Sequence, residues 1–297
     1  DRYAVSSIRG IVAGIEKFLF INDRTINKKK LMMFLPEAKK TSQRAITTEE
    51  VRLLLSASAN PRQRALIHIF SATGCRPTAL ADLKMKDIEI MAHDFTSVLF
   101  YSGSKNEFQH FCHPEATNAI NDYLNNRKQT GEELEPESYL FCKLNCIGDE
   151  KGRMSGAGIG SVLEHLMKSA NISRVKQNEK RFDLPVCNGL RNRFNTILKR
   201  DSNIPYAVAE SFMDHKLRME SSYFKPTRLE LLNEYKKAVA ELVISKESLL
   251  KLENDNKQKH IEELESGKDI QIKNMQLQID SLMSMQGTVR ELMKLKH

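Results

Sequence analysis

The spacing of apolar residues changes between Asp87 and His113, and this change constrains the fold most. Elsewhere, most apolar residues recur every three or four positions, as in helices. Within this segment they form short alternating runs separated by polar turns, which is typical of strands. The sequence therefore predicts an α+β protein, mainly α, with one small antiparallel sheet. The runs are Ile88–Ile90, Val98–Tyr101 and Phe108–Phe111.

Composition divides the chain into three predicted parts. Residues 1–42 contain apolar residues at helical spacing, the basic run Lys28–Lys30 and a second short apolar run, which together predict about two helices. A polar linker follows, and Thr47 can then cap a helix that has acidic residues in its first turn. Residues 43–228 form the predicted main domain, and residues 229–297 form a helical tail.

The tail has the composition of a long helix. From Leu229 onward glycine is rare, proline is absent, and Glu, Lys, Leu and Met dominate. Residues 246–260 keep a heptad poorly, and Ser266-Gly267 predicts a break or kink. A self-associating coiled coil and a flexible charged helix both remain open. The heptad positions are Ile272, Met275, Ile279, Leu282, Gln286, Val289 and Met293.

The balance of charge favours a polyanionic partner. The 297-residue chain has a formal net charge of +8 and a pI near 9.1, and clustered Lys and Arg gain affinity by releasing counterions from nucleic acid. No run of eighteen apolar residues is present, so we expect no membrane span and a cytoplasmic location. The chain begins at Asp1 without a charged and apolar leader, which we interpret as a fragment of an intracellular protein.

Five cysteines are too sparse for a disulfide scaffold, so we expect reduced thiols. A zinc site is the alternative, although the spacing lacks the close pairs of a zinc finger. The glycine-rich run Ser155–Gly160 lacks the ending of a phosphate-binding loop, so no nucleotide cofactor is predicted. The zinc alternative would combine His110, Cys112 and His113 with Cys142 and Cys146.

Two separate segments carry cations suited to phosphate chemistry. Arg76 precedes Pro77, and a residue before proline leaves the helical region while proline suits the first helical turn. Arg76 is therefore predicted at the entry to a helix. Lys105 lies in the polar turn of the last predicted hairpin. The alternative for each is an ordinary surface residue.

A third segment, from Asn188 to Tyr223, adds the remaining candidates. Arg191 is predicted in the first turn of a helix, and its guanidinium can bind phosphate through parallel N–H bonds. His215 can exchange a proton near neutral pH, and Tyr223 can act as a covalent nucleophile. This combination is suited to phosphoryl transfer.

In chain order these residues resemble the active-site series of the tyrosine recombinases, the phage-integrase and Xer-like superfamily. The resemblance covers residues 46–228 and implies the catalytic fold of that family. It also implies that residues 1–42 are the end of a helical core-binding domain that clamps DNA. The series is Arg76, Lys105, Asn188, Arg191, His215 and Tyr223.

The resemblance implies a reaction as well. In this family a tyrosine attacks a DNA phosphodiester, leaving a 3′-phosphotyrosyl bond and a free 5′-hydroxyl, and needs neither metal nor cofactor. The implied partner is double-stranded DNA, bound by a homo-oligomer that forms a tetrameric synapse. The implied setting is a mobile element or an archaeal or bacterial host, with the protein at the nucleoid.

The resemblance also assigns roles to the six residues. Two arginines bracket the phosphate, the lysine protonates the leaving oxygen, and the histidine bonds the phosphate or accepts the phenol proton. Three positions depart from the common pattern: Asn188 replaces a histidine or lysine, Ala79 an acidic residue and Asp214 a glycine. Asp82 could replace the missing acid, and we expect Asp214 to favour the protonated form of His215.

The sequence leaves two other functions open. The departures allow a catalytically weak DNA-binding relative with a coiled-coil assembly tail. The same chemistry with little sequence preference would give a relaxing topoisomerase of type IB.

Overall fold

The computed structural model describes residues 5–35, 43–143, 152–178, 181–200, 203–215 and 225–294. The chain divides into two units. The first unit comprises Asp1–Arg44 and Arg174–Asp183, and the second comprises Ala45–Ser173 and Leu184–His297. None of the described helices is both long and apolar enough to cross a membrane.

The first unit contains the two helices predicted for its sequence, α1 (Val5–Ile21) and α2 (Lys28–Met32). The Asn27 side chain caps α2 by accepting a hydrogen bond from the Lys30 backbone at 3.0 Å. The unit also holds an antiparallel pair, β4 (Lys176–Asn178) and β5 (Arg181–Phe182), which the sequence did not reveal.

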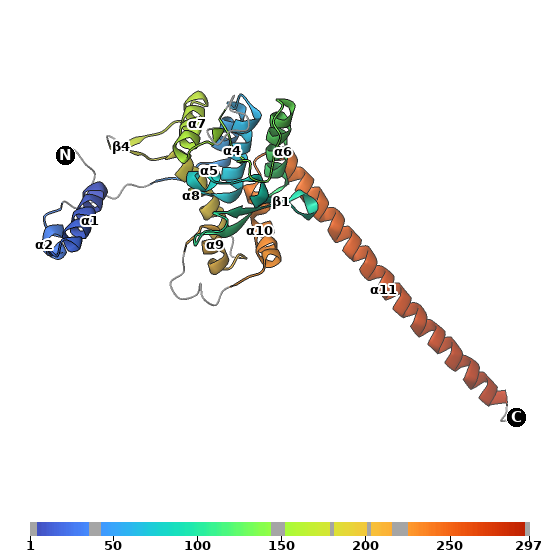
Figure 1. Cartoon of the computed structure of the whole chain (residues 1–297). Coiled ribbons are helices and arrows are strands. Elements are labelled where there is room, and N and C mark those ends of the chain that lie inside the picture. The colour runs from blue at the N-terminus through green and yellow to red at the C-terminus, as the bar shows by residue number, and fades with distance from the viewer. Residues whose placement is uncertain are drawn as a thin grey trace. The chain divides into compact units, whose positions relative to one another are not determined.

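The second unit is built around α4, whose side chains are buried along most of its length. Figure 1 shows α4 between α7 and α6, and α4 also contacts α8. The predicted cap at Thr47 is present as a reciprocal capping box with Glu50. The helices are α3 (Thr48–Ser56), α4 (Pro61–Thr73), α5 (Pro77–Ala81), α6 (Pro114–Gln129), α7 (Gly156–Ser169), α8 (Val186–Arg200), α9 (Tyr206–Phe212), α10 (Arg228–Leu242) and α11 (Lys246–Lys294), with short 3-10 turns η1 (Met85–Asp87) and η2 (Ala92–Asp94).

The predicted antiparallel sheet is confirmed. Its strand order is β1-β2-β3, and Val98 on the central strand lies opposite Ile88 on one side and His110 on the other. His110 is fully buried and lies 5.1 Å from the ring of Phe194 and 5.0 Å from that of Phe212, centroid to centroid. The sheet is therefore tied through aromatic contacts to α8 and α9. The strands are β1 (Ile88–Ile90), β2 (Thr96–Phe100) and β3 (Phe108–Cys112).

Helix α10 belongs to the packed core, although the sequence placed residues from 229 onward in the tail. Its apolar face is buried, and the fully buried Tyr235 donates a hydrogen bond to the Ala72 carbonyl at 2.9 Å. The exposed tail therefore begins at α11. The buried residues of α10 are Leu232, Tyr235, Ala238, Val239 and Leu242.

The start of α11 is held by charged side chains of the core. The Glu115 carboxylate accepts hydrogen bonds from the backbone N–H groups of Ile244 and Ser245, both at 2.8 Å. Arg52 donates to the Ile244 carbonyl at 2.7 Å. Beyond this anchor α11 continues as one helix, so the break predicted at Ser266-Gly267 does not occur.

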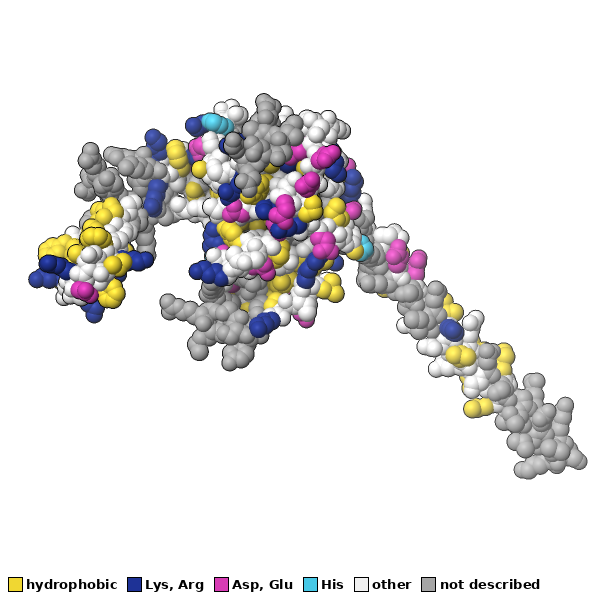
Figure 2. Space-filling view, in the orientation of Figure 1, with side chains coloured by type: hydrophobic (Ala, Val, Ile, Leu, Met, Phe, Trp, Pro, Cys, Tyr) yellow, Lys and Arg dark blue, Asp and Glu magenta, His cyan; other side chains and the backbone are white. Residues whose placement is uncertain are grey.

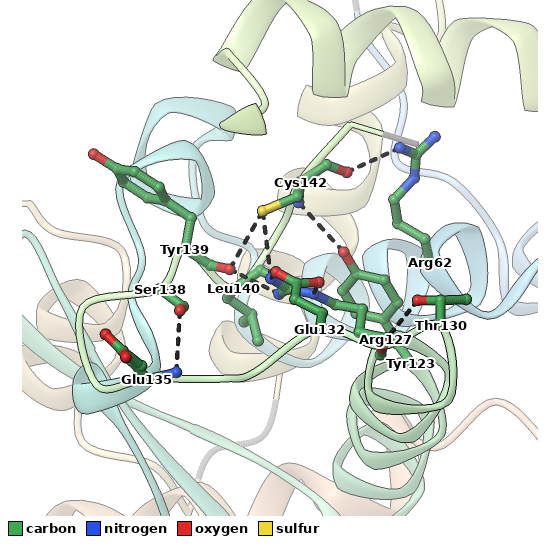
Figure 3. Close-up of polar contacts among 10 residues, drawn as sticks. All are labelled: Arg62, Tyr123, Arg127, Thr130, Glu132, Glu135, Ser138, Tyr139, Leu140 and Cys142. Carbon is green, nitrogen blue, oxygen red and sulfur yellow. Dashed lines mark hydrogen bonds and ion pairs between the residues drawn. The ribbon is translucent and has the colours of Figure 1, made fainter. Parts of the chain in front are cut away.

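The segment after α6 is fixed by a buried ion pair (Figure 3). Arg127 and Glu132 are 5% and 8% exposed, and they pair through two hydrogen bonds. Arg127 also donates to the carbonyls of Tyr139 and Leu140 at 2.7 and 2.8 Å. Arg62 on α4 donates to the Cys142 carbonyl at 2.9 Å, so the segment is attached to the central helix.

Candidate active site

Arg76 lies at the entry to α5, as predicted. Helix α4 ends at Gly74 with a left-handed φ of 57°, and Arg76 then adopts extended backbone before Pro77 at the first helical position. A Cβ atom on Gly74 would lie 2.7 Å from the Phe194 ring, so only glycine allows α8 to approach this turn so closely. The turn that carries Arg76 is therefore packed directly against α8.

Arg191 joins three segments of the second unit. It lies in the second turn of α8, one turn later than predicted, because α8 begins at Val186. Its guanidinium donates to the carbonyl of Gly74 at 2.7 Å and to that of Met213. These bonds connect α8 to the turn after α4 and to the turn after α9.

The two arginines share one electrostatic environment. Burial, and then the nearby positive charge of Arg76, lower the pKa of Arg191, while the carboxylate of Asp214 acts in the opposite direction. Asp214 forms an ion pair with Arg76, with 2.5 Å between Oδ2 and Nη1. The sequence prediction that Asp214 would act on His215 is thus not what the contacts show, because its carboxylate pairs with Arg76.

A different carboxylate, that of Glu210, contacts His215. The Glu210 Oε2 atom lies 2.8 Å from His215 Nδ1, and the His215 backbone donates to the Glu210 carbonyl at 3.1 Å. Burial opposes the charge of Glu210, but hydrogen bonds from Lys199 and His215 outweigh it and lower the pKa of Glu210. A carboxylate at Nδ1 orients the ring and leaves Nε2 as the nitrogen available to a substrate.

Sequence reasoning missed Glu210 and Lys199. Both were assigned to helices as ordinary residues, and the five-residue separation between Glu210 and His215 exceeds one helical turn. The only local signal was an acidic residue at the end of a helix just before the histidine.

Lys105 lies in the turn between β2 and β3, as predicted, and its side chain is exposed. The turn is closed by the Glu107 carboxylate, which accepts from the Gly103 backbone at 2.7 Å. At the base of the hairpin the Tyr101 hydroxyl lies 2.9 Å from the Thr78 hydroxyl on α5. The hairpin is therefore attached beside the Arg76 turn.

Of the last two predicted site residues, Asn188 is described by the structure and Tyr223 is not. Asn188 is exposed in the first turn of α8 and precedes Arg191 by three residues, so both lie on the same side of the helix. Tyr223, the predicted nucleophile, lies outside the described residues.

The described residues include Asp82 and most of the side chains of the zinc alternative. Asp82 pairs with Arg153, so its carboxylate is engaged away from the predicted orienting role. Within the described ranges no three His, Cys, Asp or Glu side chains gather closely enough to hold a metal ion. His110 and Cys112 are buried among core side chains, and Cys146 lies outside the described residues.

A family model described as "Phage integrase family" matches residues 44–227, which is more than half of the chain. The chain belongs to the phage integrase family. It is therefore a tyrosine recombinase, a member of a family of enzymes that cleave and transfer DNA strands. The matched range lies within residues 43–228, the predicted catalytic domain. Neither alternative function is favoured by this membership.

Solved structures support the phage integrase fold. The Tn1549 transposon integrase in complex with a circular intermediate DNA is 17% identical, with a TM-score of 0.54 over 80% of each chain. The same integrase in complex with transposon right end DNA gives a TM-score of 0.53 over 80% of each chain, also at 17% identity. The XerH site-specific recombinase bound to difH substrate gives 0.50 at 17% identity, covering 76% of this chain and 62% of that one.

A search of curated protein sequences finds no match to the chain. The phage integrase assignment therefore depends on the family model, and the likeness to solved structures adds the fold. The predicted fold class, a mainly helical catalytic domain with a small antiparallel sheet, is confirmed.

Proposed function

We propose that Tyr223 of this recombinase attacks a DNA phosphodiester held by Arg76 and Arg191. The observation that carries this proposal is the placement of both guanidinium groups at the turn after α9, where Met213 accepts from Arg191 and Asp214 pairs with Arg76. Tyr223 follows His215, which lies at the end of this turn, by eight positions in the sequence.

Charge balance explains why two arginines are useful. A phosphodiester carries one negative charge, and charge accumulates on its non-bridging oxygens as the fifth bond forms. Each well-placed donor to such a charge lowers the barrier by about 3 to 4 kcal/mol. Arg191 is held in place by two backbone carbonyls, so it meets the phosphate without further reorganisation. Asn188, one turn earlier, can donate one neutral hydrogen bond.

The proton steps use the remaining residues. The phenol of tyrosine has a pKa of about 10 and must lose its proton as its oxygen bonds to phosphorus. We assign that proton to the Nε2 atom of His215, whose ring Glu210 orients through Nδ1. Lys105 protonates the 5′-oxygen as its bond to phosphorus breaks. A 5′-hydroxyl of a second strand reverses the step. No metal or nucleotide enters this scheme.

A nicked suicide duplex tests the proposal. Duplexes that bind the protein would first be selected from a random library, and a nick on the 3′ side of each phosphate would let the short fragment that carries the freed 5′-hydroxyl diffuse away. The wild-type chain should become covalently attached to DNA, and Tyr223→Phe should not. Tyr206→Phe, which alters a tyrosine that is 63% exposed, is the matched control. Trapping by Tyr223→Phe, or none by the wild type, contradicts the proposal.

The DNA partner and the assembly belong to this proposal. Lys28–Lys30 and the helices α1 and α2 would provide part of a clamp on duplex DNA, as in the core-binding domains of the family.

Figure 2 shows apolar side chains along α11. Four of the predicted heptad positions, which together form an apolar seam, are 50–64% exposed. We assign this seam to a second copy of the chain, and a tetramer on DNA to the synapse. Such a protein would act in the cytoplasm at the nucleoid. The four positions are Ile272, Met275, Ile279 and Leu282.

A further inference from the structure

The position that would receive a phosphate already contains an anion. The carboxylate of Asp214 lies 2.5 Å from Arg76, and its side chain is 18% exposed compared with 43% for Arg76. Asp214 also interacts electrostatically with Arg191. A carboxylate and a phosphodiester present similar pairs of oxygens to a guanidinium, so both compete for the same N–H groups.

The backbone of Asp214 is held in a tight turn. Its φ of 52° is left-handed, a conformation that is uncommon for residues other than glycine. The Asp214 N–H donates to the Ser211 carbonyl at 3.0 Å, and the neighbouring His215 N–H donates to the Glu210 carbonyl at 3.1 Å. Because Met213 accepts from Arg191, one turn contacts both arginines, one through its backbone and the other through its side chain.

The local charge follows from this arrangement. Two guanidinium groups contribute two positive charges, and Asp214 removes one of them. A single phosphodiester would find only one compensating charge while Asp214 stays in place, and two after Asp214 has moved. The second positive charge would therefore become available to a phosphate only after the Asp214 carboxylate has left Arg76.

We propose that Asp214 is a built-in competitor for the scissile phosphate, which DNA must displace from Arg76. Asp214 is a positioning residue in this scheme, since it acts through Arg76. It lowers the affinity for isolated phosphodiesters and so favours duplexes that make every other contact. This inference rests on the proposed role of Arg76 in binding the phosphate.

Salt-dependent binding of a random-sequence duplex to the full chain tests this inference. Asp214→Asn removes the charge, and Asp214→Gly also suits the left-handed backbone, so it guards against misfolding of the first variant. Both should bind the duplex about three- to tenfold more tightly at 0.1 M NaCl, because a freed arginine gains one phosphate contact. The slope of log K against log salt should steepen by about 0.9.

Two further variants separate the possible outcomes. Glu89→Gln also removes one negative charge, from a carboxylate paired with Arg228 at 2.8 Å, and should leave the salt slope unchanged. In an Arg76→Ala background, Asp214→Asn should give no gain in affinity. An equal gain from Glu89→Gln, a gain that persists without Arg76, or none from either Asp214 variant overturns the inference.

Failure of the proposed function gives a different result. If Arg76→Ala still forms the covalent complex with nicked DNA at the wild-type rate, then Arg76 does not bind the scissile phosphate. If Arg76→Ala abolishes that complex while both Asp214 variants bind DNA as the wild type does, only the role of Asp214 fails.

Discussion

Arg191 combines structural and chemical roles within a single side chain. Its guanidinium bonds two backbone carbonyls that lie in different segments, at Gly74 and Met213. Lysine retains the charge but lacks the planar fork, so it cannot make both bonds in the same geometry. We therefore expect Arg191→Lys to slow covalent trapping about 100-fold or more, a loss typical of misplaced charge-stabilising donors.

Trapping on the nicked duplex measures this effect. Arg200→Lys is the matched control, since Arg200 lies on the same helix and pairs with Glu241 at the surface. Trapping by Arg191→Lys at the rate of the control would show that the fork geometry is dispensable.

Buried histidines should make stability depend on pH. Burial lowers the pKa of His113 to about 3, and both of its ring nitrogens lack a hydrogen-bond partner among the described residues. Between pH 6.5 and 3 the unfolded chain binds a proton there that the folded chain excludes. The free energy of unfolding is therefore at its full value above pH 6.5. It decreases as pH falls towards 3, by about 1.4 kcal/mol per pH unit for each such histidine.

Urea unfolding between pH 7 and 4 would reveal this dependence. His113→Phe keeps a buried ring without a titrating group, so its free energy of unfolding should fall less steeply with acidification. His93→Gln, at an exposed position, should match the wild-type slope. Identical slopes for His113→Phe and the wild type would contradict the assignment.

For single side chains, the sequence revealed positions but not partners. Proline after Arg76 located that side chain correctly, because the steric effect is local. The carbonyls bound by Arg191 come from residues 117 positions before it and 22 after it, and no local pattern encodes such contacts. The partner of Asp214 was mispredicted for the same reason: adjacency in sequence suggested His215, while the left-handed turn directs the carboxylate to Arg76.

Among the elements, α10 sets the boundary of the folded core. Its five buried side chains lie in the cluster that also holds Phe111, Phe194 and Phe212. Burying five such side chains stabilises by about 10 kcal/mol, which is comparable to the stability of a whole domain. A chain that ends after Ser245 should unfold cooperatively within a few degrees of the full chain, and one that ends after Thr227 should not fold.

Thermal unfolding followed by circular dichroism at 222 nm compares the two truncations. A cooperative transition in the shorter chain would place α10 outside the core. Loss of the transition in the longer one would show that α11 is needed for folding.

The sheet was predictable because its strands alternate regularly over a defined segment. The β4–β5 pair was not, because Lys176–Asn178 and Arg181–Phe182 are short and mostly polar. The boundary of the tail was misplaced because α10 shares the Leu- and Glu-rich composition of α11. Composition distinguishes a helix from a loop, but tertiary packing decides which helix is buried.

For the whole molecule, α11 should determine the oligomeric state. Seam residue Ile279 is 51% exposed and Leu277, on the opposite side of the heptad, is 60% exposed. If two tails pair along the seam, Ile279→Lys buries a charge in the interface while Leu277→Lys does not. Analytical ultracentrifugation should show a dimer or larger species for the wild type and Leu277→Lys, and a monomer for Ile279→Lys. A monomeric wild type, or equal effects of both substitutions, argues against pairing.

The attachment of α11 to the core has a mechanical consequence. The helix contains 49 residues, so its far end lies about 74 Å from its first residue. Glu115 and Arg52 form hydrogen bonds with the backbone just before the helix begins. A rotation of the catalytic domain by about 5° would therefore move that far end by about 6 Å. If neighbouring protomers bind each other through α11, a small rotation of one catalytic domain during strand exchange would therefore produce a large displacement at the far end of its helix, where the neighbour is in contact.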